Sequence, residues 1–272
     1  MSRDSPTEAI LESSRDIDRQ SVAEILSLIH AQDAEAHRAV GRVLSEIERA
    51  VDALVCCVGG GGRWFNVGAG TSGRLGVLDA SEIRPTFGMP ANAVQGIIAG
   101  GDRALRCAIE GAEDNAEAAS WALRERGLTL GDAVVAISAS GTTPFALGAV
   151  DAAHEAHARS IAVTCNPASP LVEAVEIAIV PEVGPEVIAG STRMKGGLAQ
   201  KMVLHLLSTA VMVKLGRVTG NLMTSIAPVS RKLRGRAVRI VMALACVGYE
   251  QARELLREND GDIERALQTA RR

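Results

Sequence analysis

The chain has 272 residues, of which 47% are hydrophobic and 22% charged, and its formal net charge is −3. This length fits one large domain with helical additions, and the hydrophobic share argues against a disordered chain. The small negative charge gives no general attraction for nucleic acid or anionic membranes, and with only 2% aromatic residues we expect no base-stacking surface.

Local patterns argue against a metal site and against a membrane protein. The 5 cysteines form no Cys-x-x-Cys pair, so we expect inert thiols in a reducing compartment. The N-terminus has no apolar leader, and the richest apolar segment, Met202 to Leu215, is interrupted by His205 and Lys214. We therefore expect a soluble cytoplasmic protein without a bound metal.

The first part of the chain is predicted to be helical. Residues 1–20 are polar and predict a loose arm, residues 22–29 predict a short helix, and residues 34–58 a long amphipathic helix. Four consecutive glycines, Gly59 to Gly62, are expected to end that helix.

The stretch from Phe65 to Glu82 predicts a strand, a glycine turn and a helix. The turn contains three glycines and two hydroxyl residues: Gly68, Gly70, Thr71, Ser72 and Gly73. Free backbone N–H groups and the positive end of a helix favour a bound phosphate at such a turn. The glycines also fit the dinucleotide pattern G-x-G-x-x-G, but the candidate ribose-binding residue, Asp102, lies well beyond the usual offset.

Strand and helix patterns alternate through the centre of the chain. We expect strands at 94–99, 133–138, 161–164 and 177–180, and helices at 104–126 and 144–157. Together with the strand at Phe65, they predict an α/β fold with a mainly parallel five-stranded sheet that is covered on both faces.

After Pro185 the pattern becomes helical. A long apolar helix is expected at 199–215, and two short helices at 246–272 are parted by residues 259–262. We therefore expect three regions: an N-terminal arm with helices (1–53), an α/β domain (54–217) and a helical C-terminal region (218–272).

Three loops rich in hydroxyl side chains point to a sugar phosphate. They contain Gly70, Thr71 and Ser72, then Ser138, Ser140 and Thr142, and finally Ser191 and Thr192 with the nearby Lys195. Loops that join strands to helices gather at the carboxyl edge of a parallel sheet, where ligands bind. Helix capping would explain any one Ser-Thr pair, but three such loops favour a common ligand.

Two glutamates, Glu82 and Glu113, are candidates for proton transfer, although the sequence alone does not pair them. A straight helix from Ser72 to Glu82 would cover about 15 Å, too far for both ends to touch one small sugar. Either the helix ends near Asp79, since Pro85 limits its continuation, or Glu82 reaches a site in a partner subunit.

Six segments match, in order, the motifs of one protein family. They are residues 68–82, 98–101 (Ile-Ala-Gly-Gly), 110–114 (Glu-Gly-Ala-Glu-Asp), 138–144 (Ser-Ala-Ser-Gly-Thr-Thr-Pro), 165–167 (Cys-Asn-Pro) and 190–195 (Gly-Ser-Thr-Arg-Met-Lys). Over most of its length the chain closely resembles the N-acetylmuramic acid 6-phosphate etherases, a family of the sugar isomerase (SIS) domain superfamily.

This resemblance implies a three-layer SIS sandwich and a homodimer with sugar-phosphate sites near the subunit interface. It implies cleavage of the D-lactyl ether at C3 by elimination and hydration, without a metal or organic cofactor. Glu82 matches the family glutamate that acts as acid toward the departing lactate, and Glu113 matches the second catalytic glutamate.

The chain departs from the residues usual in the family at Leu198, His205, Ser225 and Ser230. These changes leave both glutamates and the phosphate loops intact, but they leave the substrate preference open. Two alternatives use the same scaffold: a non-catalytic regulator that binds a sugar phosphate, and an aldose–ketose isomerase.

Overall fold

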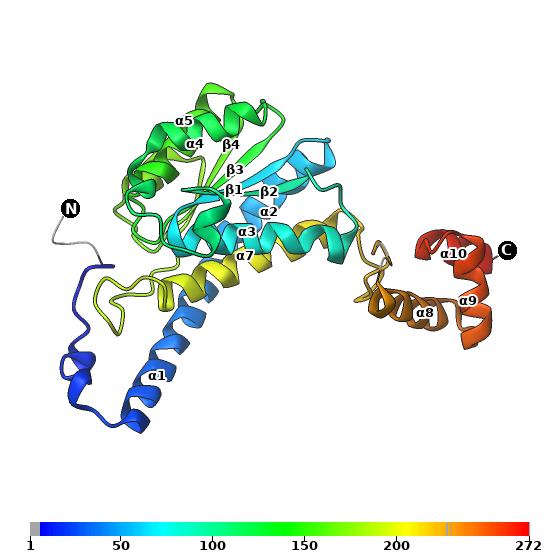
Figure 1. Ribbon diagram of the computed structural model, residues 1–272, viewed down its shortest axis with the longest axis horizontal. Helices are drawn as coiled ribbons and strands as arrows, with labels where there is room; N and C mark the ends of the chain where they lie inside the picture. The colour runs from blue at the N-terminus through cyan, green and yellow to red at the C-terminus, as the bar shows by residue number, and fades with distance from the viewer. Residues whose placement is uncertain (1–5, 227, 229, 272) are drawn as a thin grey trace.

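A computed structural model describes residues 6–226, 228 and 230–271. Its centre is a parallel sheet in the order β2-β1-β3-β4-β5 (Figure 1). The strands are β1 (Trp64–Gly68), β2 (Val94–Ile98), β3 (Ala133–Ile137), β4 (Arg159–Val163) and β5 (Ile177–Ile179). The predicted α/β fold with a five-stranded parallel sheet is therefore confirmed.

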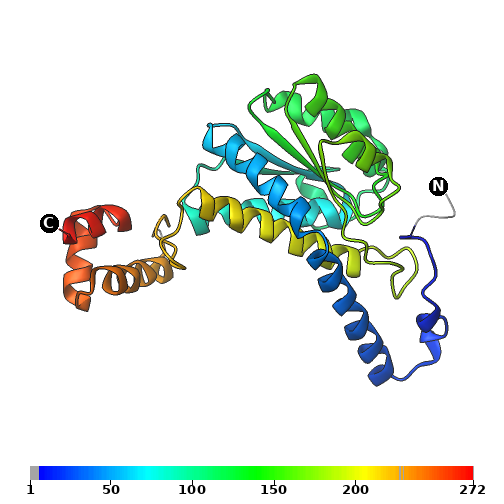
Figure 2. The same ribbon diagram turned by 180° about the vertical axis from the view of Figure 1, so that it is seen from behind.

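Both faces of the sheet are covered by helices (Figures 1 and 2). Phe65 and Val134 point toward the layer of α4 (Ala116–Glu125) and α5 (Pro144–Glu155). Trp64 and Val135 point to the opposite layer of α2 (Leu44–Gly59), α3 (Gly70–Phe87) and α7 (Lys195–Lys214). Successive strand residues are buried on opposite faces, which explains why the strands read as continuous apolar runs.

The N-terminal helices differ from the predicted boundaries. Short turns η1 (Glu12–Ser14) and η2 (Ile17–Arg19) precede α1, which runs without a break from Val22 to Gly41. A capping box starts it: Ser21 accepts a hydrogen bond from the Glu24 backbone, and the Glu24 carboxylate accepts one from Ser21. The chain therefore breaks at 42–43, not near residue 30, and α1 projects away from the sheet (Figures 1 and 2).

Helix α3 is longer than one of the two explanations for the position of Glu82 requires. It passes through Pro85 to Phe87, and Gly88 ends it in the left-handed region with φ of 66°. The alternative in which the helix ends near Asp79 and the chain turns back is therefore wrong. Pro85 removes one backbone hydrogen bond, that of its missing N–H, and the helix ends two residues later at Phe87.

The segment after β2 is less helical than predicted. Two short turns, η3 (Asp102–Leu105) and η4 (Ala112–Asp114), come before α4, whose start is capped by Asn115. Gly111 between them has a φ of 72°, which interrupts a regular helix. The short helix α6 (Pro170–Ala174), which follows β4, was not predicted.

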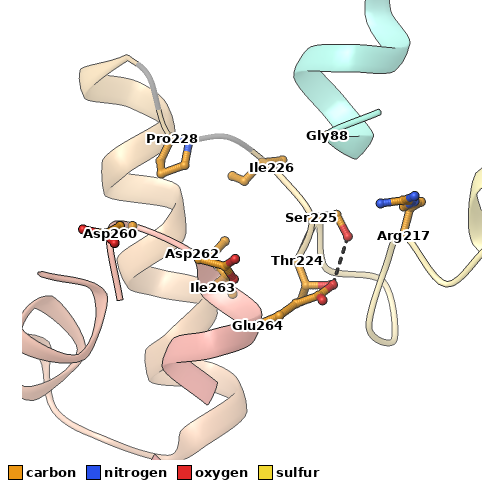
Figure 3. A pocket seen from close by; sticks show the side chains of 11 residues that line it. Gly88, Arg217, Thr224, Ser225, Ile226, Pro228, Asp260, Asp262, Ile263 and Glu264 are labelled. Carbon is orange, nitrogen blue, oxygen red and sulfur yellow. Dashed lines mark hydrogen bonds between the residues drawn. The ribbon is translucent and has the colours of Figure 1, made fainter. Parts of the chain in front are cut away.

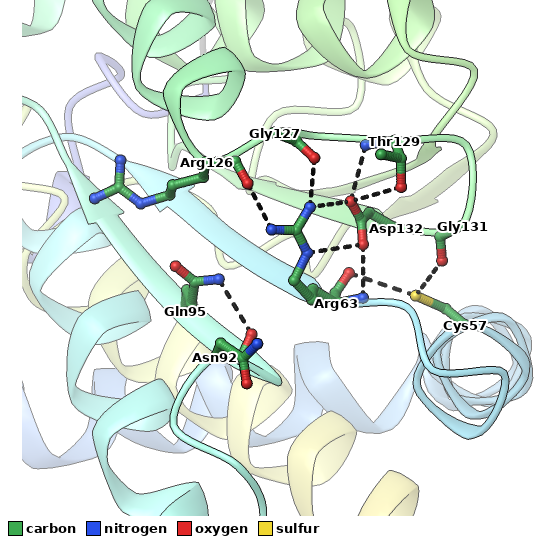
Figure 4. Close-up of polar contacts among 9 residues, drawn as sticks. All are labelled: Cys57, Arg63, Asn92, Gln95, Arg126, Gly127, Thr129, Gly131 and Asp132. Carbon is green, nitrogen blue, oxygen red and sulfur yellow. Dashed lines mark hydrogen bonds and ion pairs between the residues drawn. The ribbon is translucent and has the colours of Figure 1, made fainter.

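At the amino edge of the sheet, one ion pair joins the starts of β1 and β3 (Figure 4). Arg63 Nη2 lies 2.7 Å from Asp132 Oδ2, and the Arg63 backbone N–H donates to Asp132 Oδ1 at 2.7 Å. Burial opposes ionisation of Asp132, but the hydrogen bonds from Arg63 outweigh it and lower the pKa of this carboxyl. The sheet is thus fixed at the edge away from the hydroxyl loops.

The C-terminal region folds around a core of its own. Helices α8 (Arg231–Ala245), α9 (Tyr249–Glu258) and α10 (Ile263–Ala270) bury Ile240, Leu256 and Leu267 among other residues. They lie beyond the far end of α7, away from the sheet (Figures 1 and 2). We propose that this region is a separate unit, with its boundary near residue 218.

Helix α7 is long and apolar enough, by length and composition, to cross a membrane, but 56% of that window is buried inside the protein. It packs against α1, α2 and α3. Its apolar residues are therefore accounted for by the core of the α/β unit.

Candidate functional site

The loops after β1 and β3 start side by side at the carboxyl edge of the sheet. The last residue of β1, Gly68, pairs with the last residue of β3, Ile137. A Cβ atom on Gly68 would lie 2.8 Å from the Ile137 carbonyl oxygen, so a larger residue would push the two loops apart. The start of α7 joins them, because a Cβ on Gly197 would meet Thr71 at 3.4 Å and one on Gly196 would meet Ala139 at 3.5 Å.

The loop from Ser138 to Thr143 is held by its own hydroxyl groups. The buried Ser138 hydroxyl accepts from the Gly141 backbone at 3.0 Å and pairs with the Thr143 hydroxyl at 2.8 Å. The Ser140 hydroxyl accepts from the backbone and side chain of Thr142, and both residues remain accessible to solvent. The loop thus leaves Ser140 and Thr142 accessible and uses Ser138 to keep its shape.

Gly141 is the position in this loop that requires glycine. Its φ is 68°, and a Cβ there would lie 2.1 Å from the Ser169 hydroxyl oxygen.

The start of α3 is open to an anion. Its N-cap residue, Ala69, makes no side-chain cap, and Gly70 and Thr71 in its first turn are exposed and half-buried respectively. Ser72 differs: it is buried, and its hydroxyl donates to Gln200 Oε1 on α7 at 3.0 Å. The first-turn N–H groups and the helix dipole therefore favour an oxyanion here, whereas the Ser72 side chain joins two helices.

The start of α7 is already occupied by a carboxylate that the sequence analysis missed. Glu186 is 1% exposed and accepts hydrogen bonds from the backbone N–H groups of Lys195 and Gly196 at 3.0 and 2.9 Å. Nothing in the local pattern singles out this residue, because it caps a helix that starts nine positions later.

Lys195, a predicted phosphate ligand, points elsewhere. Its side chain is 2% exposed, and Nζ donates to Gln32 Oε1 of α1 at 2.7 Å. Burial lowers the pKa of Lys195. Ser191 and Thr192 are half-buried just before α7, so their loop stays beside the site while the Lys195 ammonium is directed toward α1.

Glu113 lies on the exposed turn η4, which contacts α5. The first residue of α4 touches the second turn of α5, since a Cβ on Gly148 would lie 2.2 Å from the Ala116 carbonyl oxygen. Arg74 of α3 also donates to the Cys107 carbonyl at 3.4 Å, which ties this segment to the start of α3. Glu113 is thus held on the same side of the sheet as the 138–143 loop.

Glu82 is exposed on α3, ten residues after Ser72. The straight helix separates the two by about 15 Å, so one chain does not bring Glu82 to its own turn at Gly70–Ser72.

A second missed residue, Asp79, lies one turn before Glu82. It is 5% exposed, its Oδ1 accepts from the Ser208 hydroxyl of α7 at 3.1 Å, and its Oδ2 has no hydrogen-bond partner in the described part of the chain. Burial raises the pKa of Asp79 to about 6, partly offset by the hydrogen bond from Ser208. Its i+4 neighbour Ile83, which is 3% exposed, could have placed it on the buried face of the helix.

Three of the four departures from the family pattern have identifiable surroundings. His205 is exposed, and its Nδ1 lies 2.9 Å from the Lys201 carbonyl oxygen. Ser225 donates to Glu264 at 3.0 Å, and Ser230 caps the start of α8. Leu198 is 38% exposed on α7, and no contact accounts for it.

Across the described residues, no group of three or more His, Cys, Asp or Glu side chains is arranged to hold a metal ion.

Comparisons with known proteins agree with this geometry. A family model for the N-terminal SIS domain of glucokinase regulatory protein matches residues 46–154. A phosphoheptose isomerase from Francisella tularensis superposes with a TM-score of 0.55 at 22% identity, covering 71% of this chain and 98% of its own. A phosphoheptose isomerase from Neisseria gonorrhoeae has a TM-score of 0.52 at 20% identity, covering 70% and 98%. These two structures show that the fold is of the sugar isomerase type.

Closer relatives are found among curated sequences. The N-acetylmuramic acid 6-phosphate etherase of Symbiobacterium thermophilum is 48% identical over 263 residues, covering 96% of this chain and 87% of the relative. That of Jannaschia sp. is 46% identical over 261 residues, covering 96% and 83%. At this identity and coverage, with the SIS-type fold and the glycine-hydroxyl loops in place, the chain belongs to the N-acetylmuramic acid 6-phosphate etherase family.

Proposed function

We propose that this chain cleaves the D-lactyl ether of N-acetylmuramic acid 6-phosphate, giving N-acetylglucosamine 6-phosphate and D-lactate. The observation that carries the proposal is the meeting of the uncapped start of α3 with the accessible hydroxyls of the 138–143 loop at one edge of the sheet. The etherase names of relatives at 46% and 48% identity support the reaction. We place this carbon–oxygen lyase in the cytoplasm, because a phosphorylated sugar does not cross a lipid bilayer unaided.

The phosphate is expected to bind between α3 and the 138–143 loop. Backbone N–H groups of Gly70 and Thr71 and the hydroxyls of Ser140 and Thr142 are the donors available to it. Ser72 and Ser138 are predicted ligands whose hydroxyls are buried and already paired, so we assign them to holding the loops. Ser191 and Thr192 are left for the hydroxyl groups of the sugar.

The reaction needs one ionised and one neutral carboxyl. In the open-chain sugar the aldehyde acidifies the proton on C2, which Glu113 removes. The C3–O bond then breaks, its electron pair goes to the lactate oxygen, and Glu82 protonates that oxygen. Water adds to C3 of the unsaturated aldehyde while a proton returns to C2, which completes the hydration.

We further propose that the protein is a homodimer and that each site takes Glu82 from one subunit and Glu113 from the other. The straight α3 supports this, because it keeps Glu82 about 15 Å from the phosphate loop of its own chain. Leu78 of α3 is 46% exposed and Leu198 of α7 is 38% exposed, and such side chains on adjacent helices suit burial against a second copy.

The first test is D-lactate release by Glu82→Gln and Glu113→Gln. Each variant is expected to lose release by about 100-fold or more while still binding N-acetylglucosamine 6-phosphate. Glu117→Gln, an exposed glutamate on α4, is the matched control and is expected to retain activity. Lactate release by both catalytic variants at the rate of the control would contradict the mechanism.

A mixed dimer tests the sharing of the site. If the two glutamates come from different subunits, coexpressing Glu82→Gln with Glu113→Gln chains creates one intact site in each mixed dimer. Random pairing then restores about a quarter of the full activity, whereas sites built within one chain stay inactive. Separately tagged chains allow the mixed dimer to be purified and assayed.

The match to the glucokinase regulatory protein SIS domain favours one alternative, a regulator that binds a sugar phosphate without turnover. The same assay separates the two functions, since a regulator binds the sugar phosphate and releases no lactate.

A further inference from the structure

The stretch from Val187 to Tyr249 is strongly basic within a chain of net negative charge. It contains 10 lysine and arginine residues and no aspartate or glutamate. Five of these cations lie in α8: Arg231, Lys232, Arg234, Arg236 and Arg239. A single-sign stretch of this length sets up a local positive potential that attracts anions.

The arginines of α8 differ from those of the next two helices. In α9 and α10, Arg253, Arg257 and Arg265 each form an ion pair with an acidic residue three positions earlier. In α8, Arg236 and Arg239 have no carboxylate partner among the described residues. The one polar contact of Arg236 there is between Nη1 and the Met223 sulfur at 3.2 Å, and a thioether is a weak acceptor.

Arg236 and Arg239 line a cavity of about 290 Å³. They are three positions apart and therefore share a face of α8. The other described residues of the lining are one amide and three apolar side chains: Asn221, Leu222, Met223 and Ile240. Asn221 is fixed by a tight turn, in which Thr219 and Leu222 exchange backbone hydrogen bonds of 3.1 and 3.0 Å.

A neighbouring cavity of about 370 Å³ gives a contrast (Figure 3). Among the described residues, Arg217 is its one cationic lining residue, whereas Asp260, Asp262 and Glu264 line the other side. Three carboxylates there disfavour an anion, so the basic character belongs to the α8 cavity.

We infer that α8 and the turn at 219–223 form a second ligand site, which binds a small phosphate monoester. A phosphate monoester carries a charge of about −1.5 to −2 at neutral pH, which the two guanidinium groups neutralise, and a guanidinium can donate two parallel hydrogen bonds to phosphate oxygens. Asn221 offers a further hydrogen bond, and Leu222 and Ile240 suit the C–H face of a sugar ring. The volume is at the small end of ligand sites and fits a hexose phosphate.

This site is distinct from the 138–143 loop of the same chain. Helix α7 starts beside that loop and spans about 30 Å before the chain reaches α8. Figures 1 and 2 show α8 beyond the far end of α7.

The test is calorimetric titration of the full chain with N-acetylglucosamine 6-phosphate. The wild-type chain is expected to bind two molecules, and Arg236→Gln/Arg239→Gln to bind one, with affinity at the α8 site reduced tenfold or more. Ser140→Ala/Thr142→Ala is expected to weaken the other site and leave the α8 site unchanged. Arg239→Gln alone, at an exposed position, is expected to weaken the α8 site without affecting the fold.

Arg253→Gln is the matched control, because it removes an exposed arginine that already has a partner. One bound molecule in the wild type, unaffected by the α8 variants, would overturn the inference while leaving the proposed function intact. One bound molecule lost in both double variants would mean that α8 completes the catalytic site of a second subunit, which also overturns a separate site. Binding at α8 alone would support this inference and count against the proposed function.

Discussion

Two helices begin at the same edge of the sheet behind similar residues, and their starts differ in charge. Helix α3 starts with Gly-Thr-Ser and has no side-chain cap, whereas α7 follows Gly-Ser-Thr and is capped by the buried Glu186. Both starts present free N–H groups, so an anion is favourable at each. At α7 the protein supplies the anion, and at α3 we propose that the position is left for the phosphate of the ligand.

This difference assigns separate roles to the two helices. A carboxylate with two backbone hydrogen bonds stabilises the fold whether or not substrate is present. An uncapped helix start gives up that stability until a ligand arrives, which is typical of binding sites. Four substitutions test this comparison, in order of decreasing effect.

The largest effect is expected for Gly68→Ala. A Cβ there would lie 2.8 Å from the Ile137 carbonyl oxygen and 3.0 Å from the Gly73 nitrogen. Since both contacts are with backbone, we expect the free energy of unfolding to fall by about 2–4 kcal/mol. We also expect lactate release to be lost. The control is Gly197→Ala at the start of α7, where the nearest atom is 3.4 Å away. Chemical denaturation and the lactate assay check both, and equal effects of the two substitutions would contradict the comparison.

Next in size is Glu186→Gln. An amide keeps the shape but donates where the carboxylate accepted, so one of the N–H groups of Lys195 and Gly196 loses its partner. We expect the free energy of unfolding to fall by about 2–3 kcal/mol. Urea unfolding at neutral pH measures it, with the exposed Glu182→Gln as control. An unchanged midpoint would show that the cap contributes little.

The contact between α3 and α7 gives a prediction of how the stability depends on pH. The pKa of Asp79 is raised to about 6 in the folded state from its usual 3.8, so the folded protein binds more protons between those values. The stability of the wild type is therefore expected to fall as pH rises from 4 toward 6 and to stay lower above 6. Asp79→Asn removes this loss of stability. The difference in the free energy of unfolding between the variant and the wild type should therefore grow in favour of the variant by about 2 kcal/mol between pH 4.5 and 7.5.

Urea titrations at both pH values measure this growth. Ser208→Ala, which removes the hydrogen bond to Asp79, serves for comparison and is expected to lower stability most where Asp79 is ionised. A constant difference between Asp79→Asn and wild type across this pH range would contradict the assignment.

The smallest effect is expected for a substitution that tests whether the start of α3 binds the phosphate. Ala69→Ser supplies the missing cap and is expected to stabilise the ligand-free protein by about 1 kcal/mol. The same hydroxyl competes for the N–H groups that we assign to the phosphate, so affinity for N-acetylglucosamine 6-phosphate should fall severalfold. Melting temperature and calorimetry measure the two effects, and tighter binding would remove α3 from the phosphate site.

Periodicity and composition were enough to predict the strands, their mainly parallel arrangement and the position of the glycine-hydroxyl loops. These features are local: an apolar run between turn residues specifies a buried strand, and the loop after it must lie at the carboxyl edge. The predictions failed where a single residue ends or continues a helix. The break at 42–43 and the turn at Gly111 interrupt the expected helices, while Pro85 does not end α3.

The sequence by itself thus determined the α/β sheet, the position of the glycine-hydroxyl loops and, through the motifs, the family. Only the tertiary structure decided which helix start is open, because the fold brings Glu186 to the start of α7 and no spacing in the sequence predicts this contact. It also decided that Lys195 turns to Gln32, a partner 163 positions away, and that Asp79 is buried against Ser208. The reason is physical: the pattern of a segment fixes which backbone it forms, but the direction and charge of a side chain depend on what packs against it.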